Sequence, residues 1–336
     1  MNPILSIGIT SYKRIKELER CINSIQTKYA DNIEIIVSED CSPLSKEIGE
    51  MVNNMAENSK YELKFMPNEH NLGYDRNLGA IIKKSRGEYV FFMSDDDALY
   101  EGFLDLLIPF IKQENNKKYG VIYAPFVKLN RKDRNYGRDM EIEKGELNAS
   151  KHIYDSILFS GLIFKKVFVK EYDSEQFLNM NYFQVYMFLK MIYHYGGYYF
   201  AHPSVWCVED GENAYGLSES SGGNALLADR NSIISNLEFN KTLFKVIRKF
   251  DEEENTHVFD SFEKQYSMHI YSAMSIARSG GLAYYKEFWR RLNSLDIKLY
   301  PVTKIYYCML LIFGSKVSDT LTSVGRRMLK HNERVA

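Results

Sequence analysis

Three consecutive aspartates, Asp95, Asp96 and Asp97, follow an apolar segment at residues 89–93 that has the pattern of a buried strand. Carboxylates held this close repel one another, so the arrangement is costly unless a cation lies among them. Mg²⁺ and Mn²⁺ prefer carboxylate oxygen and also bind phosphates. The triplet therefore indicates a site for a divalent cation and a diphosphate. The alternative is an acidic turn in which Ser94 or Asp97 caps the next helix.

The aspartates belong to a series of alternating strand and helix patterns that covers the first 126 residues. Such alternation predicts an α/β fold whose sheet is mainly parallel and flanked by helices. Ligands of these sheets bind beyond the carboxyl ends of the strands. Residues 10–14, 39–40 and 95–97 follow three predicted strands, so we expect them to converge on one crevice. Strands are expected at residues 4–9, 33–37, 61–66, 89–93 and 121–123, and helices near 15–25, 48–55, 78–82 and 102–112.

The remaining chain has a different pattern. Residues 127–150 are rich in charge and predict a surface loop, whereas residues 209–224 predict a glycine-containing loop long enough to be a mobile lid. Between them we expect strands at 158–164, 198–200 and 205–208 and a helix at 177–195. The division expected is a first half at 1–126, a second half of the same domain at 127–225, and a helical C-terminal extension at 226–336.

Composition narrows the class of protein. The 336 residues carry a net charge of -1, so no overall basic field favours nucleic acid as a partner. The four cysteines are scattered without metal-binding spacing, which is typical of reduced thiols in a cytosolic protein. We find no signal-peptide pattern, and the apolar run at 305–313 is short of the roughly 20 residues that span a bilayer. A cytoplasmic location is therefore expected.

The C-terminal segment combines an apolar stripe with a basic tail. Such a segment is able to lie on an anionic membrane surface, at the inner face of the cytoplasmic membrane. The alternative is that the stripe packs on the core while the charges are solvated. The stripe comprises Tyr306, Met309, Leu310, Phe313 and Val317, and the tail contains Arg326, Arg327, Lys330 and Arg334.

Four sequence blocks, in order, resemble family 2 glycosyltransferases with the GT-A fold. They lie at residues 6–14, 36–42, 71–79 and 87–97. One block alone is a weak signal, but four in the right order are specific. The resemblance covers about residues 3–126, is faint as far as residue 208, and is absent from the helical tail. It implies a Rossmann-like GT-A domain that binds a nucleotide-diphosphate sugar.

The resemblance assigns roles around the nucleotide. Asp40 would accept a hydrogen bond from a pyrimidine edge, which favours UDP, CDP or dTDP without choosing among them. Glu39 would bind ribose hydroxyls. Arg14 and Arg76 would offset diphosphate charge, or form ordinary surface ion pairs. The full nucleotide-sugar set comprises Thr10, Tyr12, Arg14, Glu39, Asp40, Asn71, Arg76 and Asp95.

The same resemblance implies a Mn²⁺ or Mg²⁺ cofactor that stabilises the leaving diphosphate. Its expected ligands are Asp96, Asp97 and, more weakly argued, His202, with Asp95 facing the ribose or a metal-bound water. The family's Asp-x-Asp motif begins here with Ser94, which leaves the coordination open.

A second departure concerns the proton acceptor. The family usually has a Glu-Asp pair at the start of the helix before the glycine turn, where this chain has Gln184 and no acid. Gln184 is then an acceptor-binding candidate. For the catalytic base the sequence offers Asp210 and Glu209 on the glycine-containing loop, with Asp173 and Glu175 less favoured.

These observations predict a metal-dependent glycosyltransferase acting on a lipid-linked glycan in bacterial surface polysaccharide or O-antigen synthesis. The last part of this expectation is analogy with family members. Two alternatives remain open. One is a nucleotidyltransferase, although the glycine-rich basic loop expected after its first strand is missing. The other is a sugar-nucleotide or glycan-binding protein that lacks a catalytic base.

Overall fold

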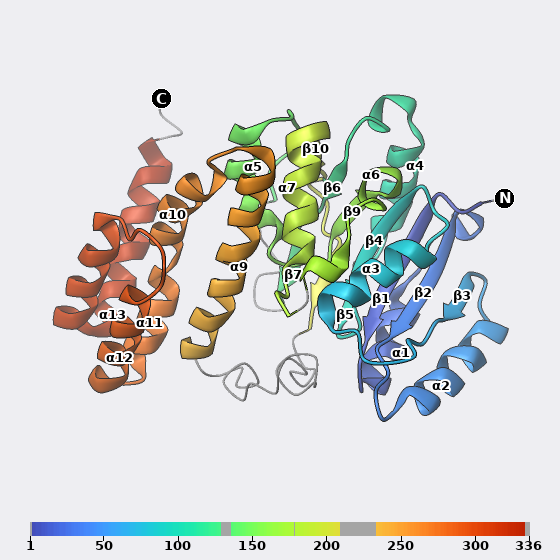
Figure 1. Ribbon diagram of the computed structural model, residues 1–336, viewed down its shortest axis with the longest axis horizontal. Coiled ribbons are helices and arrows are strands. Elements are labelled where there is room, and N and C mark those ends of the chain that lie inside the picture. Colours follow the sequence, from blue (N-terminus) through green and yellow to red (C-terminus); the bar gives the residue numbers. More distant parts are fainter. Residues whose placement is uncertain (1, 129–135, 178, 209–232, 333–336) are drawn as a thin grey trace.

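The computed structural model describes residues 2–128, 136–177, 179–208 and 233–332. The strands of its central sheet are β1 (Leu5–Ser11), β2 (Ile33–Glu39), β3 (Glu62–Phe65), β4 (Tyr89–Ser94), β6 (Val121–Tyr123), β8 (Met140–Ile142), β9 (Leu162–Lys165) and β10 (Gly197–Tyr199). Their spatial order is β3-β2-β1-β4-β9-β6-β10-β8 (Figure 1). The first four of these are parallel to one another, which confirms the expected strands of the N-terminal half.

Beyond β4 the sheet is mixed rather than mainly parallel. β9 is antiparallel to both β4 and β6, and β8 is antiparallel to β10 at the edge. β6 therefore runs in the same direction as β4, and β10 pairs parallel with β6. The strand expected at 158–164 begins only at Leu162, because the preceding Gly161 has a left-handed backbone with φ of 99°. The carboxyl ends of β1, β2, β4, β6 and β10 share one edge.

Helices cover both faces of the sheet. They include α1 (Ile15–Ser24), α2 (Ser45–Glu57), α3 (Tyr74–Lys84), α4 (Phe103–Lys112), α5 (Glu146–His152), α6 (Lys166–Val169) and α7 (Phe183–Tyr195). Neighbouring residues of β4 enter different cores, as the alternation of a strand requires. Phe91 packs in the core that contains α1, α2 and α4, and Val90 in the core that contains α3 and α7.

A small second sheet follows the aspartates. It comprises β5 (Asp97–Leu99), β11 (Val205–Cys207) and β7 (Phe126–Lys128), in the order β5-β11-β7. Asp97 pairs with Cys207 in this sheet, so it does not cap a helix, and α4 begins only at Phe103. The expected loop at 127–150 likewise contains β8 and α5. Each of the missed strands has only three residues, one of them charged, so neither alternation nor an apolar run marks it in the sequence.

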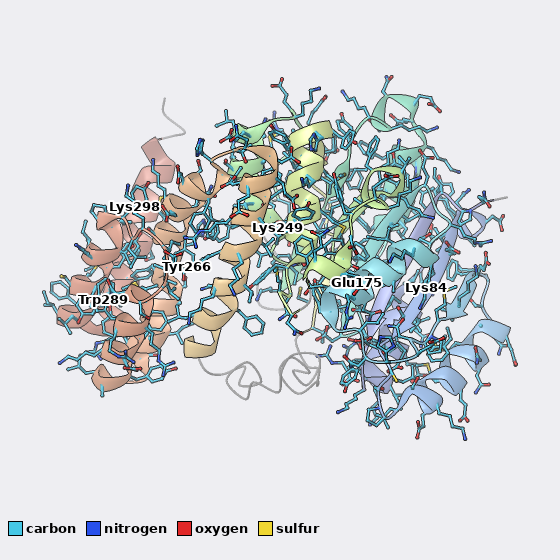
Figure 2. The ribbon with its side chains drawn as sticks, in the orientation of Figure 1. Lys84, Glu175, Lys249, Tyr266, Trp289 and Lys298 are labelled. Carbon is cyan, nitrogen blue, oxygen red and sulfur yellow. The ribbon has the colours of Figure 1, made fainter. Side chains whose placement is uncertain are left out.

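The C-terminal region is helical, as expected. It comprises α9 (Ile233–Glu254), α10 (Val258–His269), α11 (Tyr271–Ser279), α12 (Leu282–Asn293) and α13 (Pro301–Asn332). These helices lie at the end of the molecule away from α2, and one apolar core joins them to α7 (Figure 1). Lys249 and Trp289 lie in this region, whereas Lys84 and Glu175 lie beside the sheet (Figure 2). Among the described helices, none has the length and apolarity that crossing a bilayer requires.

Candidate active site

The aspartate triplet lies at the carboxyl end of β4, and all three residues are buried. The guanidinium group of Arg14 forms ion pairs with two of them. Arg14 Nη1 lies 2.7 Å from Asp95 Oδ1 and 3.1 Å from Asp96 Oδ2. The backbone N–H of Tyr12 also donates to Asp95, at 3.3 Å. The loop between β1 and α1 is therefore tied to the triplet, which brings together four of the expected site residues.

Burial makes these carboxylates unusual acids. It raises the pKa of Asp95 to about 7, although Arg14 opposes the rise. Burial also raises the pKa of Asp97 to about 7, although hydrogen bonds from Ser160 and Cys207 oppose the rise. At neutral pH the charged forms of both residues are therefore close in free energy to the protonated forms. A site that holds two such acids gains from a bound cation.

Ser94 and Ser160 form hydrogen bonds beside the aspartate triplet. Ser94, which stands where the family usually has an aspartate, donates its hydroxyl to Asp96 Oδ1. The backbone N–H of Ser94 donates to Ser160 Oγ at 3.1 Å. Ser160 immediately precedes the left-handed Gly161. Sequence reasoning did not select Ser160, because a lone serine before a glycine carries no motif.

A second group of expected residues gathers at the end of β2. Asp40 accepts hydrogen bonds from the backbone N–H groups of Leu72 and Gly73, at 2.7 and 2.9 Å, and from Asn68 Nδ2 at 3.0 Å. Asn71 Nδ2 donates to the Asp40 carbonyl oxygen at 3.1 Å. Burial raises the pKa of Asp40, and these hydrogen bonds oppose it. The carboxylate expected to bind a pyrimidine thus also anchors the loop that leads into α3.

Glu39 is more deeply buried than Asp40, but its carboxylate accepts fewer hydrogen bonds. Its Oε1 accepts the backbone N–H of Ser42 at 3.0 Å, and its Oε2 has no hydrogen-bond partner in the described structure. Ser11 Oγ, at the paired position of β1, also lacks one there. Buried polar atoms without partners are rare and usually await a ligand or water. Thr10 lies in register between Ser38 of β2 and Ser94 of β4, at the same edge.

The α3 residues hold the second half of the site in place. Asp75, which sequence reasoning overlooked, accepts backbone N–H groups of Asn181 and Phe183 at 2.7 and 2.9 Å, so it caps α7 from another helix. Burial raises the pKa of Asp75 to about 6. Arg76 donates to the Leu72 carbonyl oxygen and pairs with Glu175 at 3.3 Å. Arg76 therefore forms the surface ion pair that the sequence offered as the alternative to diphosphate binding.

Gln184 lies in the first turn of α7 and is almost fully buried. Its Nε2 donates to the Ile157 carbonyl oxygen at 3.1 Å, and its Oε1 has no partner among the described residues. Glu209 and Asp210, the expected catalytic bases, lie outside the described residues, as does the rest of the predicted lid loop. Of the two less favoured acids, Glu175 pairs with Arg76, and Asp173 Oδ1 accepts the Glu175 N–H.

The structure gives His202 a partner other than the aspartates. Its Nε2 lies 3.8 Å from Asp139 Oδ1, and its ring lies 4.6 Å from that of Phe200. Within the described ranges no three His, Cys, Asp or Glu side chains form a metal-binding group. The aspartates nevertheless fit a hard cation, because they offer buried carboxylate oxygens and a metal that holds substrate phosphates needs only one or two protein carboxylates.

One further polar cluster was not expected from the sequence. His152 Nδ1 lies 2.9 Å from Asp155 Oδ2 and 3.2 Å from the Tyr123 hydroxyl. Tyr123 is the last residue of β6, so the cluster belongs to the same edge of the sheet as the aspartates. Its members are separated by 29 and 3 positions in the sequence, without any recognisable motif.

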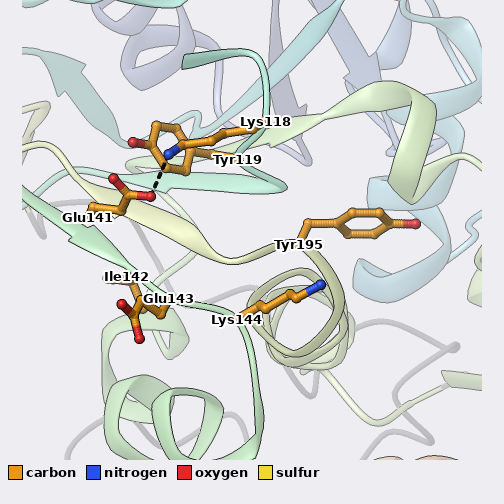
Figure 3. A pocket seen from close by; sticks show the side chains of 7 residues that line it. All are labelled: Lys118, Tyr119, Glu141, Ile142, Glu143, Lys144 and Tyr195. Atoms are coloured by element: carbon orange, nitrogen blue, oxygen red, sulfur yellow. Dashed lines mark hydrogen bonds and ion pairs between the residues drawn. The ribbon is translucent and has the colours of Figure 1, made fainter. Parts of the chain in front are cut away.

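A surface pocket of about 340 Å³ lies elsewhere (Figure 3). Gly120 and Gly196 place it at the amino ends of β6 and β10, the edge opposite the aspartates. Lys118 and Glu141 form an ion pair across its wall. It is therefore not part of the candidate active site. Its lining consists of Lys118, Tyr119, Glu141, Ile142, Glu143, Lys144 and Tyr195.

Comparison with solved structures identifies the class of this fold. The mannosyltransferase PcManGT from Pyrobaculum calidifontis, solved in complex with GDP-Man and Mn²⁺, aligns with a TM-score of 0.51 at 14% identity, covering 94% of this chain and 89% of that one. The fold is a GT-A fold, and at this identity the likeness extends to the fold alone.

Sequence comparison identifies the family. Residues 6–172 match the model of glycosyl transferase family 2, so the chain contains a glycosyltransferase family 2 domain. Abequosyltransferase RfbV of Salmonella typhimurium is 32% identical over 113 residues, 33% of each chain. The GalNAc(5)-diNAcBac-PP-undecaprenol beta-1,3-glucosyltransferase of Campylobacter jejuni is 30% identical over 122 residues, 36% of this chain and 38% of that one. The matched part therefore spans little more than a third of these curated relatives.

Proposed function

We propose that this protein is a metal-dependent glycosyltransferase that moves a sugar from a pyrimidine nucleotide-diphosphate donor to a glycan acceptor. The observation that carries the proposal is the buried aspartate triplet at the carboxyl end of β4. There Arg14 forms ion pairs with the carboxylates of Asp95 and Asp96. A site with this charge distribution suits a divalent cation with a diphosphate. The family 2 domain over residues 6–172 supports the same reaction.

Asp96 and Asp97 are the residues we propose to hold the metal, with His202 a weaker candidate. When bound, Mn²⁺ or Mg²⁺ supplies charge stabilisation to the departing nucleotide diphosphate. Asp95 and Arg14 orient the ribose and diphosphate from the other side of the triplet. Thr10, Tyr12, Glu39, Asp40 and Asn71 form the nucleoside side of the site, and the unpartnered Oε2 of Glu39 is available to a ribose hydroxyl.

The acceptor hydroxyl must lose a proton, and Gln184 cannot accept one at neutral pH. We propose Asp210 or Glu209 as the proton acceptor, with Gln184 contacting the acceptor sugar. The test compares Asp210→Asn and Glu209→Gln with Asp155→Asn as a control from the polar cluster. Loss of transfer by one of the first two variants, with donor binding retained, supports the assignment. Loss in Asp155→Asn alone moves the role to the His152 cluster.

The acceptor is proposed to be a lipid-linked glycan of bacterial surface polysaccharide synthesis, used at the inner face of the cytoplasmic membrane. One relative supports the lipid-linked acceptor by name: the Campylobacter jejuni glucosyltransferase is named for an undecaprenol-linked glycan. The C-terminal segment would then make a peripheral contact with the membrane.

The direct experiment incubates the protein with UDP-, CDP-, dTDP- and GDP-sugars, with and without Mn²⁺, and measures released nucleotide diphosphate. We expect release from one pyrimidine donor that depends on the metal. A preference for a GDP-sugar would refute the pyrimidine assignment, and metal-independent release would refute the proposed metal site.

One observation favours a second candidate function, that of a sugar-nucleotide or glycan-binding protein. The first turn of α7 contains no acidic residue. In the same experiment, binding of a nucleotide without release from any donor would favour that function. Pyrophosphate formation from a nucleoside triphosphate and a sugar phosphate would instead indicate a nucleotidyltransferase.

A further inference from the structure

The last helix of the described structure exposes an unusual number of large apolar side chains. Among the α13 residues up to 323, whose side chains the structure describes, five large apolar ones expose half or more of their surface to solvent. Isolated apolar residues on a surface are normal, but a series along one helix usually marks an interaction site. The five residues are Ile305, Ile312, Phe313, Val317 and Leu321, and we call them the α13 apolar stripe.

The core does not need this stripe, because other residues of α13 make the contacts with α11. Leu310 and Ser318 are fully buried, and Arg278 of α11 donates to the Leu310 carbonyl oxygen at 3.0 Å. Asp319 accepts the hydroxyls of Tyr271 and Ser275 at 2.8 and 2.7 Å. The stripe expected from the sequence is thus divided: Tyr306, Met309 and Leu310 pack on the core, whereas Phe313 and Val317 are exposed.

Charge indicates what covers the stripe. Within residues 301–332 the basic residues are Lys304, Lys316, Arg326, Arg327 and Lys330, and the one acid is Asp319. Asp319 is exposed and accepts two hydroxyls of α11, so five basic residues stand against one acid in this part of the sequence. Apolar side chains beside an excess of lysine and arginine are typical of helices that lie in the plane of an anionic bilayer surface.

We propose that α13 docks on the surface of an anionic membrane through its apolar stripe, with Lys304 and Lys316 contacting lipid phosphates. This inference rests on the function proposed above, to which it adds a defined surface and a defined lipid chemistry. The two halves of α13 meet at Gly314, whose φ of 71° interrupts the helix between Phe313 and Val317. The stripe therefore belongs to two short helical segments, as suits a surface contact.

The test measures binding of the full chain to sedimenting vesicles of phosphatidylcholine alone and of phosphatidylcholine with phosphatidylglycerol. We expect binding to the anionic vesicles only, weakened by salt. Double variants Ile312→Ser/Phe313→Ser and Val317→Ser/Leu321→Ser should each reduce vesicle partitioning about tenfold. Lys316→Glu should reduce it less. Leu147→Ser is the matched control, because Leu147 is an exposed leucine on α5, and its binding should equal that of the wild type.

Donor hydrolysis without vesicles separates this proposal from the catalytic one. The stripe variants should release nucleotide diphosphate as the wild type does, which also shows that they fold. Equal binding to neutral and anionic vesicles, or unchanged binding by both double variants, would overturn the membrane surface. A dimer that the same variants dissociate, without vesicle binding by the wild type, would overturn it in favour of a second copy of the chain.

Discussion

Arg14 Nη1 lies between two carboxylates, 2.7 Å from Asp95 and 3.1 Å from Asp96. Arg20 Nη2 donates to the Asp96 carbonyl oxygen at 2.8 Å, so three buried carboxyl groups in sequence lie beside these two arginines. Asp95 and Asp97 have pKa values near 7. This imbalance is what a bound cation would relieve. It also makes the site sensitive to pH in a direction that follows from the pKa shifts.

The first prediction concerns pH and metal. Unfolded aspartates have a pKa of about 3.9, so between about pH 4 and pH 7 the folded protein retains protons that the unfolded chain has released. Without metal, these residues should therefore make the protein less stable as pH rises through that window. Added Mn²⁺ competes with the protons and should raise the melting temperature more at about pH 8 than at about pH 6. Asp97→Asn should reduce both effects, whereas an equal Mn²⁺ shift at the two pH values would contradict the metal site.

The second prediction concerns Asp96. Ser94 and Arg14 hold its side chain at the centre of the triplet, where it is the proposed primary ligand. Asp96→Ala should reduce metal-dependent donor turnover by about 100-fold or more. Ser94→Ala serves as the control, because it removes a hydrogen bond to Asp96 without removing a carboxylate. Full metal-dependent activity in Asp96→Ala would refute the assignment.

The third prediction separates Asp40 from Glu39. Asp40→Asn weakens the acceptor for two backbone N–H groups, so we expect a loss of about 2 kcal/mol in the free energy of unfolding. Glu39→Gln retains an oxygen for the Ser42 N–H and should cost less than about 1 kcal/mol. Nucleotide binding by calorimetry should nevertheless weaken in Glu39→Gln. Unchanged affinity in that variant would exclude Glu39 from the nucleoside site.

Sequence reasoning recovered the parts of this molecule whose signal is local. Strands such as residues 33–37 are continuous apolar runs, and the triplet at Asp95 to Asp97 follows one directly, so both were identified. β5, β7 and β8 were missed because each is a three-residue strand that contains a charged residue, whereas the equally short β6 is wholly apolar and was predicted. The contact of Asp75 with the start of α7 joins positions 106 and 108 apart in the sequence. No single-sequence pattern encodes such a pair, since tertiary packing alone brings the two helices together.

The fourth prediction uses that contact. Burial raises the pKa of Asp75 to about 6, against about 3.9 in an unfolded chain. The folded state thus holds an extra proton between about pH 4 and pH 6, and the stability from this group falls by about 3 kcal/mol as pH rises through the window. Asp75→Asn should flatten the pH dependence of urea unfolding by this amount. Asp75→Ala leaves N–H groups at the start of α7 without an acceptor and should cost about 2 kcal/mol throughout. A wild-type slope in Asp75→Asn would show that Asp75 is not the group that titrates.

The last prediction concerns the later turns of α7, which pack against α9 of the helical extension. Lys190 is buried and forms ion pairs with Glu253 and Glu254 of α9, at 2.9 Å to Glu253. Lys190→Met removes both pairs, but Glu253 keeps Lys249 at 2.6 Å and Glu254 keeps His194 at 3.0 Å, so the variant should cost about 2 kcal/mol. In the triple variant Lys190→Met/Glu253→Gln/Glu254→Gln the two carboxylates that Lys190 contacted are neutral, and part of that stability should return.

Kinetic measurements distinguish a role of these α7 contacts in acceptor binding from a role in packing alone. Asp75 fixes the start of α7 and Lys190 its later turns, so Gln184 is positioned from both sides. The triple variant should therefore raise the KM for the acceptor while the KM for the donor stays unchanged, because most of the proposed nucleotide-binding residues lie on or directly after β1, β2 and β4. Equal increases in both values would show that α9 supports the whole domain rather than the acceptor side.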